Sequence, residues 1–248
     1  MIKGLPVRPL FTFGGVDLSQ YVVAEQVERQ LINIETSWGG VFDRPERLLK
    51  RNAKGKEIKV QVRFLTESFQ ELADDIHNFN MALLKPKQNE LASLKLWDRP
   101  STYDMVVPDG SISFERVSKT GKADVTFKSP YAYSLSNTQT TYRGTDSMVI
   151  KGYGGVQPII TGTFLAGSKP RFTDVTNGKV LMLDYTLPAD DTIIIDCANR
   201  TIKASKITNP HRYLTYESRF FEFDTGPFKI TSPDAKEIIV QYNERWLV

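Results

Sequence analysis

The stretch at residues 123–128 reads Ala-Asp-Val-Thr-Phe-Lys, so apolar and polar side chains alternate along it. This period of two predicts a β-strand with one dry face and one wet face. Ser129-Pro130 then ends the strand, because proline has no N–H to donate to a neighbouring strand. We therefore predict that the chain divides here into two modules, residues 1–133 and residues 134–248.

The first module also carries the one helix that the sequence predicts. Ser68 stands at an N-cap position and Glu71 follows three residues later, which is the spacing of a capping box. Lys85-Pro86 ends the helix, because the residue before proline avoids the helical region. We expect one face of the helix to cover a sheet, since apolar residues recur on it at spacings of three and four: Phe69, Leu72, Ile76, Phe79 and Leu83.

The remainder of the chain reads as strands separated by turn signals. Residues 57–65 alternate as clearly as residues 123–128 and predict another strand. Pro-Asp-Gly-Ser at residues 108–111 predicts a turn between two strands, and Asn177-Gly178 predicts a hairpin. We therefore predict a mainly β protein, with a sheet or sandwich and one α-helix in the first module and a β-sandwich or jelly roll in the second.

Length, charge and cysteine content narrow the class of protein. The 248 residues are enough for two domains with buried cores, and the net charge of +3 does not by itself indicate a nucleic-acid or membrane partner. The single cysteine, Cys197, cannot form an intramolecular disulfide, which fits folding in a reducing cytosol. The first residues lack the apolar region of a signal peptide, and no apolar run approaches about 20 residues. We expect a protein that is made in the cytosol and stays soluble.

No pattern in the sequence predicts an active site. The histidines, His77 and His211, have no cysteine or carboxylate at metal-ligand spacing. Asp190-Asp191 would point to opposite faces of a strand, so a solvated turn is a simpler interpretation than an acid–base pair. Gly152–Gly155 fits neither a dinucleotide fingerprint nor a P-loop and reads as a turn, while Cys197 reads as a small buried apolar residue. We expect no enzyme activity, no metal site and no cofactor.

One stretch is strongly basic. From Arg44 to Lys59, seven Lys or Arg residues stand against two Glu residues, and Asn52–Lys56 looks like the tip of a loop. The stretch is either a solvated hairpin loop or an arm that meets an acidic surface or nucleic acid. Nucleic acid is disfavoured, because no aromatic side chains are interleaved for stacking on bases. Contact with a neighbouring protein subunit stays open.

The order of several short motifs along the chain resembles the distal tail protein family, the hub of the tail tip of long-tailed bacteriophages. The motifs cover most of the chain, and each is weak alone. They are Phe-Thr-Phe-Gly-Gly-Val-Asp-Leu-Ser-Gln-Tyr at 11–21, the strand at 58–65 with the helix after it, Leu-Lys-Leu-Trp-Asp-Arg-Pro at 94–100, Val-Thr-Phe-Lys-Ser-Pro-Tyr at 125–131, Gly-Gly-Val-Gln-Pro-Ile-Ile-Thr-Gly at 154–162, and Leu-Pro at 187–188 with Thr-Ile-Ile-Ile-Asp at 192–196.

The resemblance implies a structural hub of a long non-contractile tail tip or baseplate, present in the virion and synthesised in the host bacterial cytoplasm. The N-terminal β-sandwich would form a homo-hexameric ring, and the C-terminal module would be a galectin-like β-sandwich. Partners would be the major tail tube protein, the tail-associated lysin or tip protein, and receptor-binding or baseplate proteins, with no membrane and no sequence-specific nucleic acid. In such a ring the basic stretch becomes a candidate subunit interface, whose residues are Arg44, Arg47, Leu48, Leu49, Lys50 and Arg51.

Two other functions stay as alternatives. A galectin-like half suggests a carbohydrate-binding module that recognises a host cell-wall saccharide, but Trp38, Trp97 and Trp246 all lie outside the middle of the second module. The second half also has no long insertion, so we expect no additional carbohydrate-binding domain. A hydrolase would need two carboxylates in one cleft, and nothing in the sequence places such a pair.

Overall fold

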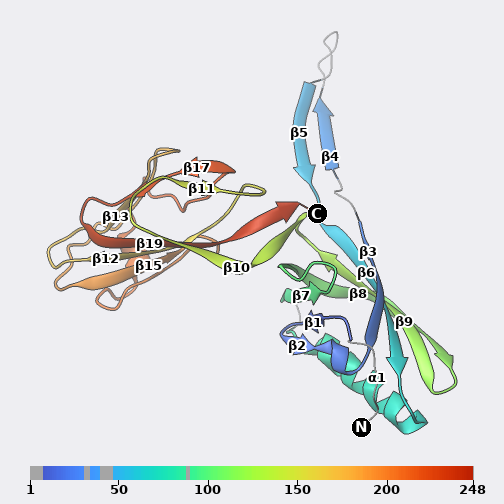
Figure 1. Cartoon of the computed structure of the whole chain (residues 1–248). Helices are drawn as coiled ribbons and strands as arrows, with labels where there is room; N and C mark the ends of the chain where they lie inside the picture. The colour runs from blue at the N-terminus through green and yellow to red at the C-terminus, as the bar shows by residue number, and fades with distance from the viewer. Residues whose placement is uncertain (1–7, 31–33, 40–46, 88–89, 248) are drawn as a thin grey trace. The chain divides into compact units, whose positions relative to one another are not determined.

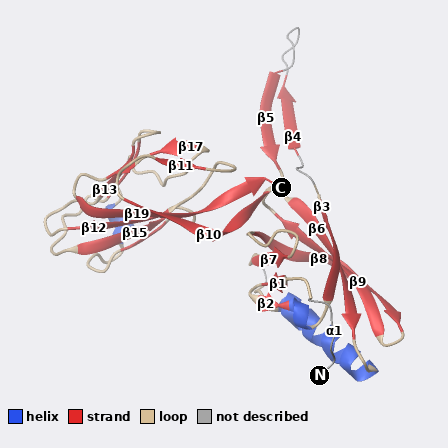
Figure 2. Cartoon of the chain, in the orientation of Figure 1, coloured by secondary structure: helices blue, strands red, loops and turns tan. Residues whose placement is uncertain are grey.

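The computed structural model describes residues 8–30, 34–39, 47–87 and 90–247 (Figure 1). The chain divides into two compact units, unit 1 with residues 1–135 and 247–248, and unit 2 with residues 136–246. The predicted fold class is confirmed, since strands dominate both units and α1 is the α-helix of the described residues (Figure 2). Residues 134–141, which follow the predicted boundary, lie in strand β10 (Tyr133–Arg143).

Unit 1 is built on two ladders that share strand β8. Strand β8 pairs with β7 through residues 104–106 and with β9 through residues 107–117. One ladder therefore runs β2-β1-β7-β8 and the other runs β3-β6-β9-β8. The elements are β1 (Phe11–Phe13), β2 (Val16–Asp17), a 3-10 turn η1 (Leu18–Gln20), β3 (Val23–Arg29), β4 (Ile34–Gly39), β5 (Arg47–Ala53), β6 (Lys56–Leu65), α1 (Phe69–Leu84), β7 (Ala92–Leu96), β8 (Thr102–Val117) and β9 (Thr120–Ser129).

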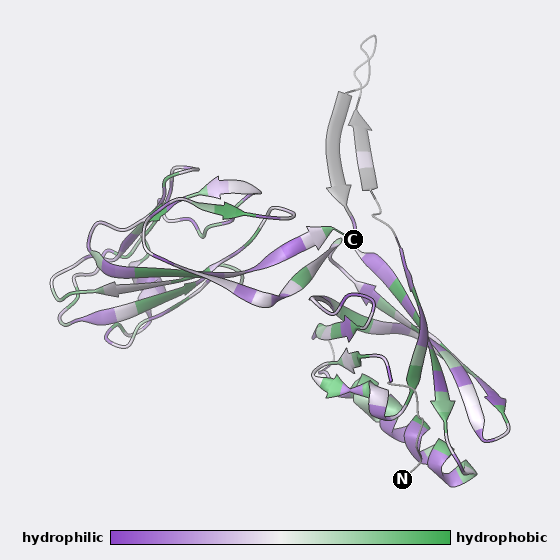
Figure 3. Cartoon of the chain, viewed as in Figure 1, coloured by the Kyte–Doolittle hydropathy of each residue, from purple (hydrophilic) through white to green (hydrophobic). Residues whose placement is uncertain are grey.

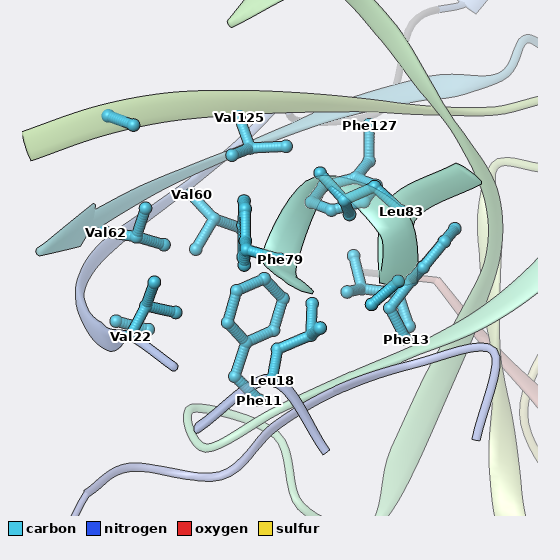
Figure 4. Packing of buried hydrophobic residues seen from close by; sticks show 14 of the residues in the cluster. Phe11, Phe13, Leu18, Val22, Val60, Val62, Phe79, Leu83, Val125 and Phe127 are labelled. Carbon is cyan, nitrogen blue, oxygen red and sulfur yellow. The ribbon is translucent and has the colours of Figure 1, made fainter. Parts of the chain in front are cut away.

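The core of unit 1 lies between these ladders and helix α1 (Figure 4). The alternation predicted for β6 and β9 is present, because every second side chain of each strand is buried and the residues between them face solvent (Figure 3). Phenylalanine rings from different elements meet in the middle, with Phe11 and Phe13 of β1 both against Phe127 of β9. Phe79 of α1 packs against Phe11 and against Phe64 of β6.

Helix α1 begins and ends where the sequence predicts. The Ser68 side-chain oxygen accepts a hydrogen bond from the Glu71 N–H at 3.1 Å, as an N-cap does. Leu72, Phe79 and Leu83 are buried and Ile76 is partly buried, so the expected face covers the sheet. Phe69 departs from the prediction: its side chain is 54% exposed and the Arg116 guanidinium lies 4.4 Å from its ring centre.

The predicted turn at residues 108–111 is wrong. These residues lie inside the long strand β8, whose register against β9 shifts between Asp109 and Ser113. The shift is a β-bulge, which absorbs extra residues without ending the strand. Gly110 has a φ of +79°, a left-handed conformation that glycine adopts without a Cβ clash. Turn-forming residues therefore mark an irregularity in the ladder here and not its end.

Unit 2 packs two main sheets over one core. The run β16-β15-β12-β19-β10 lies on one side, and β14-β13-β18 forms the other. Both contribute to a single buried cluster that includes Ile160, Ile193 and Phe172. The elements after β10 are β11 (Met148–Ile150), β12 (Ile159–Phe164), β13 (Arg171–Asp174), β14 (Lys179–Met182), β15 (Asp191–Asp196), β16 (Thr201–Lys203), a 3-10 turn η2 (Pro210–Tyr213), β17 (Gly226–Phe228), β18 (Ile230–Thr231) and β19 (Ala235–Leu247).

The hairpin predicted at Asn177-Gly178 is present and joins β13 to β14. Asp174 pairs with Lys179 at its base, so the turn is longer than the two residues expected. The buried Asp174 carboxylate closes this turn by accepting hydrogen bonds from the Thr176 N–H at 3.0 Å, the Asn177 N–H at 3.2 Å and the Asn177 side-chain amide at 2.9 Å. The sequence predicts the position of this turn but not its length, and the buried Asp174 carboxylate fixes its conformation.

The interpretation of Asp190-Asp191 as a solvated turn is wrong for Asp191. Its side chain is buried and accepts hydrogen bonds from the Ser205 hydroxyl at 2.6 Å and from the Lys206 N–H at 2.7 Å. Burial opposes the charge, but these bonds outweigh it and hold the pKa of Asp191 below its usual value. The carboxylate thus fastens the segment after β16 to the start of β15.

We expect Asp191→Ala to lower the free energy of unfolding of unit 2 by about 2–4 kcal/mol, because it leaves buried donors without an acceptor. Scanning calorimetry of the full chain measures the change. Asp234→Ala, at an exposed carboxylate of the same unit, is the control and should leave the transition in place. Equal transitions for the two variants would contradict the fastening role of Asp191.

Candidate assembly interface

Strands β4 and β5 form a hairpin arm of their own in unit 1. They pair with each other, from Ile34 with Ala53 to Gly39 with Arg47, and make a separate two-stranded sheet among the described strands. The arm lies in the chain between β3 and β6, whose own ladder pairs Arg29 with Ile58. It is an insertion into a continuous ladder, drawn at the top of Figure 1.

Most residues of the predicted subunit interface belong to strand β5 of this arm. Arg47, Leu48, Lys50 and Arg51 pair in register with Gly39, Trp38, Ser37 and Thr36 of β4, and Leu49 stands at the β-bulge between Ser37 and Trp38. Arg44 lies outside the described residues. The structure therefore places five of the six candidates on one strand, while their role in a subunit contact stays a prediction.

The expected loop tip at Asn52–Lys56 is wrong. Asn52 and Ala53 end strand β5, and Lys56 begins strand β6, so this segment is the root of the arm. A glycine is required at the root: a Cβ on Gly55 would collide with the carbonyl oxygen of Ser129. Gly55 thus allows the chain to pass from the arm into β6 while lying against the end of β9.

Lys56 is not part of a solvated basic surface. Its side chain is 4% exposed, and its ammonium group lies 2.7 Å from the Asp104 carboxylate and donates to the Ser134 hydroxyl at 2.8 Å. The Ser134 hydroxyl in turn donates to the same Asp104 carboxylate at 2.6 Å. This lysine therefore leaves the basic stretch with fewer exposed charges than the sequence count suggests.

Arg29, the last residue of β3, reaches the same carboxylate from the other root of the arm. Its guanidinium donates to Asp104 at 2.7 Å and, through two further N–H groups, to both oxygens of Asp98 at 3.0 and 3.1 Å. The paired geometry toward Asp98 is the bidentate form that arginine makes with carboxylates. We name Arg29, Lys56, Asp98, Asp104 and Ser134 the root cluster.

The root cluster ties both roots of the arm to other strands. Arg29 ends β3 and Lys56 begins β6. One residue past the last pair of this ladder, the Gln30 N–H donates a hydrogen bond to the Glu57 carbonyl at 2.9 Å. Asp104 belongs to β8 and Ser134 lies at the start of β10. Because buried charges with several partners leave little freedom of geometry, the cluster fixes where the arm leaves the sheet.

The electrostatics of the root cluster favour a charged Asp104. Its side chain is 3% exposed, and such burial opposes ionisation. The Lys56 ammonium, then the Ser134 hydroxyl and the Arg29 guanidinium, outweigh that effect and lower the pKa of Asp104. One carboxylate therefore faces the Lys56 and Arg29 side chains and a hydroxyl donor. Burial lowers the pKa of Lys56, and the charge of Asp104 opposes that shift.

The ladder β3-β6-β9-β8, called the second ladder below, has two further features, at its edges and on the face away from the core. Strand β3 pairs with β6 alone among the described strands, and residues 108–117 of β8 are all exposed. The face of this ladder away from the core is polar and holds a hollow of about 400 Å³. The hollow is lined by Gln26, Glu28, Lys59, Gln61, Ser111, Ser113, Asp124 and Thr126.

Residues that could suggest catalysis lie apart from one another. His77 is exposed on α1, while the ring of His211 in η2 accepts a hydrogen bond from the Ile202 N–H at 3.1 Å. Cys197 is buried as predicted, and burial raises the pKa of its thiol to about 12. No group of three or more metal-ligating side chains occurs among the described residues. In the same part of the chain, no helix has the length and apolar character to cross a membrane.

The sequence missed the root cluster for a simple reason. Its members lie up to 105 positions apart and are single polar residues at the ends of strands, where polar residues are ordinary. The one available signal was Lys56, which precedes a strand whose alternation makes every second position buried. Extending the alternation from Ile58 back to Lys56 would have placed this lysine on the dry face.

The comparisons with known proteins agree with this architecture. Residues 151–246 match the family model described as the siphovirus-type tail component, C-terminal domain. A comparison with curated protein sequences finds no match. The fold is similar to that of SPP1 Dit (gp 19.1), described as a paradigm of the hub adsorption apparatus in phages that infect Gram-positive bacteria, with a TM-score of 0.80, 13% identity and coverage of 96% of this chain and 99% of that chain.

Two structures of the phage p2 baseplate in its activated conformation contain further similar chains. The one with Sr gives a TM-score of 0.55 at 11% identity, covering 95% of this chain and 98% of that chain. The one with Ca gives 0.57 at 10% identity, covering 96% and 98%. The predicted resemblance to the distal tail family is confirmed by the family model in unit 2 and by the fold along the whole chain.

We expect Asp104→Asn to lower the free energy of unfolding of unit 1 by about 3–5 kcal/mol, because it leaves the buried Lys56 ammonium without a counter-charge and leaves Arg29 with Asp98 alone. Hydrogen exchange of the amides in β6 and β9 measures the change. The control is Asp109→Asn, on the same strand as Asp104, which breaks an exposed pair with Lys128 of β9 and should leave the protection of β6 and β9 nearly unchanged.

The pH dependence of hydrogen exchange in Asp104→Asn is a second test of the charge on Asp104. A carboxyl group with a lowered folded pKa stabilises the fold above its unfolded pKa of about 3.9, and this stabilisation is lost as pH falls through the folded pKa. Protection of β6 and β9 should therefore fall below about pH 4 in the natural chain, and more weakly in Asp104→Asn. Parallel curves for the two proteins would contradict the charge of Asp104 as the source.

Proposed function

Because residues 151–246 match a siphovirus-type tail component and the fold is similar to that of SPP1 Dit, we propose that this chain is the structural hub of a long non-contractile phage tail tip. Six copies form a ring that joins the tail tube to the tip, and the protein carries no catalytic activity. The observation that supports the ring most directly is the second ladder of unit 1, which offers β3 at one edge and the exposed half of β8 at the other.

Two different open edges suit a head-to-tail ring. An exposed edge strand presents unpaired N–H and C=O groups, which favours pairing with another chain. Residues 108–117 of β8 form a long edge of this kind and carry the partly exposed side chains of Ile112, Phe114 and Val117. Pairing β8 of one subunit with β3 of the next is a heterologous contact, and repeated around an axis it closes into a ring.

The polar face of the same ladder suits the inside of such a ring. Alternation along β6 and β9 puts Val60, Val125 and Phe127 toward the core and Lys59, Gln61, Asp124 and Thr126 on the other face. That outer face holds the hollow of about 400 Å³ lined by polar and charged side chains. A continuous sheet made by six subunits would therefore give a hydrated channel wall.

The arm supplies a second contact with the neighbouring subunit. A hairpin that pairs only with itself among the described strands has edges to add to another sheet. Arg47, Leu48, Leu49, Lys50 and Arg51 of β5 are the interface candidates, together with Arg44. The root cluster fixes the point from which the arm extends, which lowers the entropy lost when it docks.

The proposed ring contacts all belong to unit 1, so unit 2 is available to bind other proteins of the tail tip. In this proposal the ring binds the major tail tube protein on one side and the tail-associated lysin or tip protein on the other. Unit 2 carries receptor-binding or other baseplate proteins during host attachment and DNA ejection. The protein is made in the host cytoplasm and acts in the virion. The family match of residues 151–246 supports a tail role for this unit.

Replacing residues 31–54 by a short Gly-Ser turn tests the arm. The Gln30 N–H already donates to the Glu57 carbonyl, so a tight connection can join the two strands while Gly55 and Lys56 stay in place. We expect the natural chain to show a mass near six times 28.1 kDa by light scattering, and the shortened chain to lose the hexamer. Intact hexamers of the shortened chain would exclude the arm from the assembly.

The matched control for this deletion is Lys56→Met with the arm intact. It removes a buried cation at the root and should lower stability without removing any contact that the arm makes. If the control also loses the hexamer while keeping its secondary structure by circular dichroism, the geometry of the root and not the arm surface decides assembly. If both variants stay hexameric, the arm has no part in the ring.

Engineered disulfides test the two edges. Glu28→Cys on β3 is combined in turn with Ser111→Cys, Ser113→Cys and Glu115→Cys on β8, to sample the register. Within one subunit these strands lie about 14 Å apart, three strand spacings, which is too far for a disulfide. On oxidation we expect one pair to give a non-reducing gel ladder up to six subunits.

The single variants are the controls for this experiment. A head-to-tail contact needs both cysteines, so Glu28→Cys alone and each β8 variant alone should stay uncross-linked. Dimers from a single variant would indicate a two-fold contact in place of a ring. The natural Cys197 is buried and should not react.

A further inference from the structure

Unit 2 contains a polar hollow that the hub function does not use. It has a volume of about 530 Å³ and lies where the loop after β11, the segment before β17 and the end of β19 meet. Its lining is Tyr153, Gly154, Gly155, Glu222, Asp224, Thr225 and Arg245. The residues come from three separate parts of the sequence, so only the fold assembles them.

The loop from Gly152 to Gly155 is fixed in place by its neighbours. The Tyr153 N–H donates to the Arg245 carbonyl at 2.7 Å, and the Thr225 hydroxyl donates to the Gly152 carbonyl at 2.8 Å. Directly after the loop, Val156 and Phe223 exchange two backbone hydrogen bonds at 2.9 and 2.8 Å. The wall of the hollow is therefore preformed, as ligand sites usually are.

Glycine keeps the hollow open at its centre. A Cβ on Gly155 would come within 2.9 Å of the Arg245 guanidinium and 3.0 Å of the Glu222 carboxylate, and this glycine has a φ of +77°. A side chain there would occupy the space between the two charged groups. The absence of a side chain lets the arginine and the carboxylate face the same small volume.

The chemistry of the lining matches a polyhydroxylated ligand. Glu222 and Asp224 supply carboxylate acceptors, Arg245 supplies N–H donors and Tyr153 supplies a partly exposed ring with a hydroxyl. Vicinal hydroxyls can donate to a carboxylate and accept from a guanidinium at the same time. We propose that this hollow binds a neutral saccharide, with Tyr153 under the sugar ring and Asp224, Glu222 and Arg245 on its hydroxyls.

The charges exclude two other ligand classes. Two carboxylates against one guanidinium give the lining a net negative charge, which disfavours sulfated, phosphorylated or sialylated glycans. A metal ion is also disfavoured, because the described residues contain no group of three or more ligating side chains. A neutral ligand with many hydroxyls uses both kinds of charge without repulsion.

A second hollow of unit 2 serves as a comparison. It has a volume of about 500 Å³ and is lined by Thr163, Asp190, Asp191, Thr192, Ile194, Lys203, Ala204 and Ser205. It offers no aromatic ring, and the Asp191 carboxylate in it already accepts hydrogen bonds from Ser205 and Lys206. The hollow at Gly152–Gly155 is therefore the better saccharide site of the two.

The test uses the full chain on an array of neutral glucose, galactose and N-acetylglucosamine oligosaccharides, with sulfated and sialylated counterparts. We expect retention on a subset of the neutral glycans alone. Tyr153→Ala and Asp224→Ala should each weaken binding at least tenfold in a titration with the best neutral glycan. Tyr216→Ala is the matched control, since Tyr216 is 95% exposed in the same unit outside the hollow, and it should bind as the natural chain does.

Three results would overturn the proposal: no retention of any neutral glycan, equal retention of the acidic glycans, or binding unchanged in both Tyr153→Ala and Asp224→Ala. The melting temperature of each variant separates lost binding from lost folding. Solution mass is measured on the same samples. Loss of glycan binding with an intact hexamer would contradict the saccharide site alone, and glycan binding without a hexamer would contradict the ring alone.

Discussion

The buried ion pairing of Asp104 with Lys56 and Arg29 is the interaction on which the geometry of the arm in unit 1 depends. The Asp104 carboxylate is buried, and it holds the Lys56 ammonium at 2.7 Å and the Arg29 guanidinium at 2.7 Å. Those cations stand at the two roots of the arm, at the end of the ladder of β3 and β6. The arrangement is costly to break, because removing the Asp104 carboxylate leaves the buried Lys56 ammonium without a counter-charge. It converts a long hairpin into an arm with a fixed origin.

Unit 2 also relies on buried carboxylates, but these accept hydrogen bonds from neutral backbone and side-chain donors in place of cations. Asp174 closes the turn between β13 and β14, and Asp191 fastens the segment around Ser205 to β15. Each carboxylate is buried and accepts several hydrogen bonds, so each fixes a connection and not a catalytic geometry. These carboxylates explain how a chain of short strands keeps a well-defined turn after β13 and a well-defined segment after β16.

A hub and a saccharide site are compatible because they use different units. The edges, the polar face and the arm that support the ring belong to unit 1, while the hollow at Gly152–Gly155 belongs to unit 2. Trp246, which lay too far along the sequence to suggest a sugar platform, has its ring 3.6 Å from the position of a Cβ on Gly152. Sequence distance was a poor guide to the surroundings of that loop.

Local sequence patterns are enough to predict the mainly β class, the bounds of helix α1, the hairpin at Asn177-Gly178 and the motif order typical of distal tail proteins. These follow from local alternation, caps and turn residues, which act within a few positions of each other. The folded chain was needed to find that Lys56 is buried, that Pro-Asp-Gly-Ser at 108–111 is a bulge, and that Tyr153, Asp224 and Arg245 share a hollow. Burial and pairing between distant segments set these outcomes, and a pattern read along one stretch carries no information on which segment will lie against it.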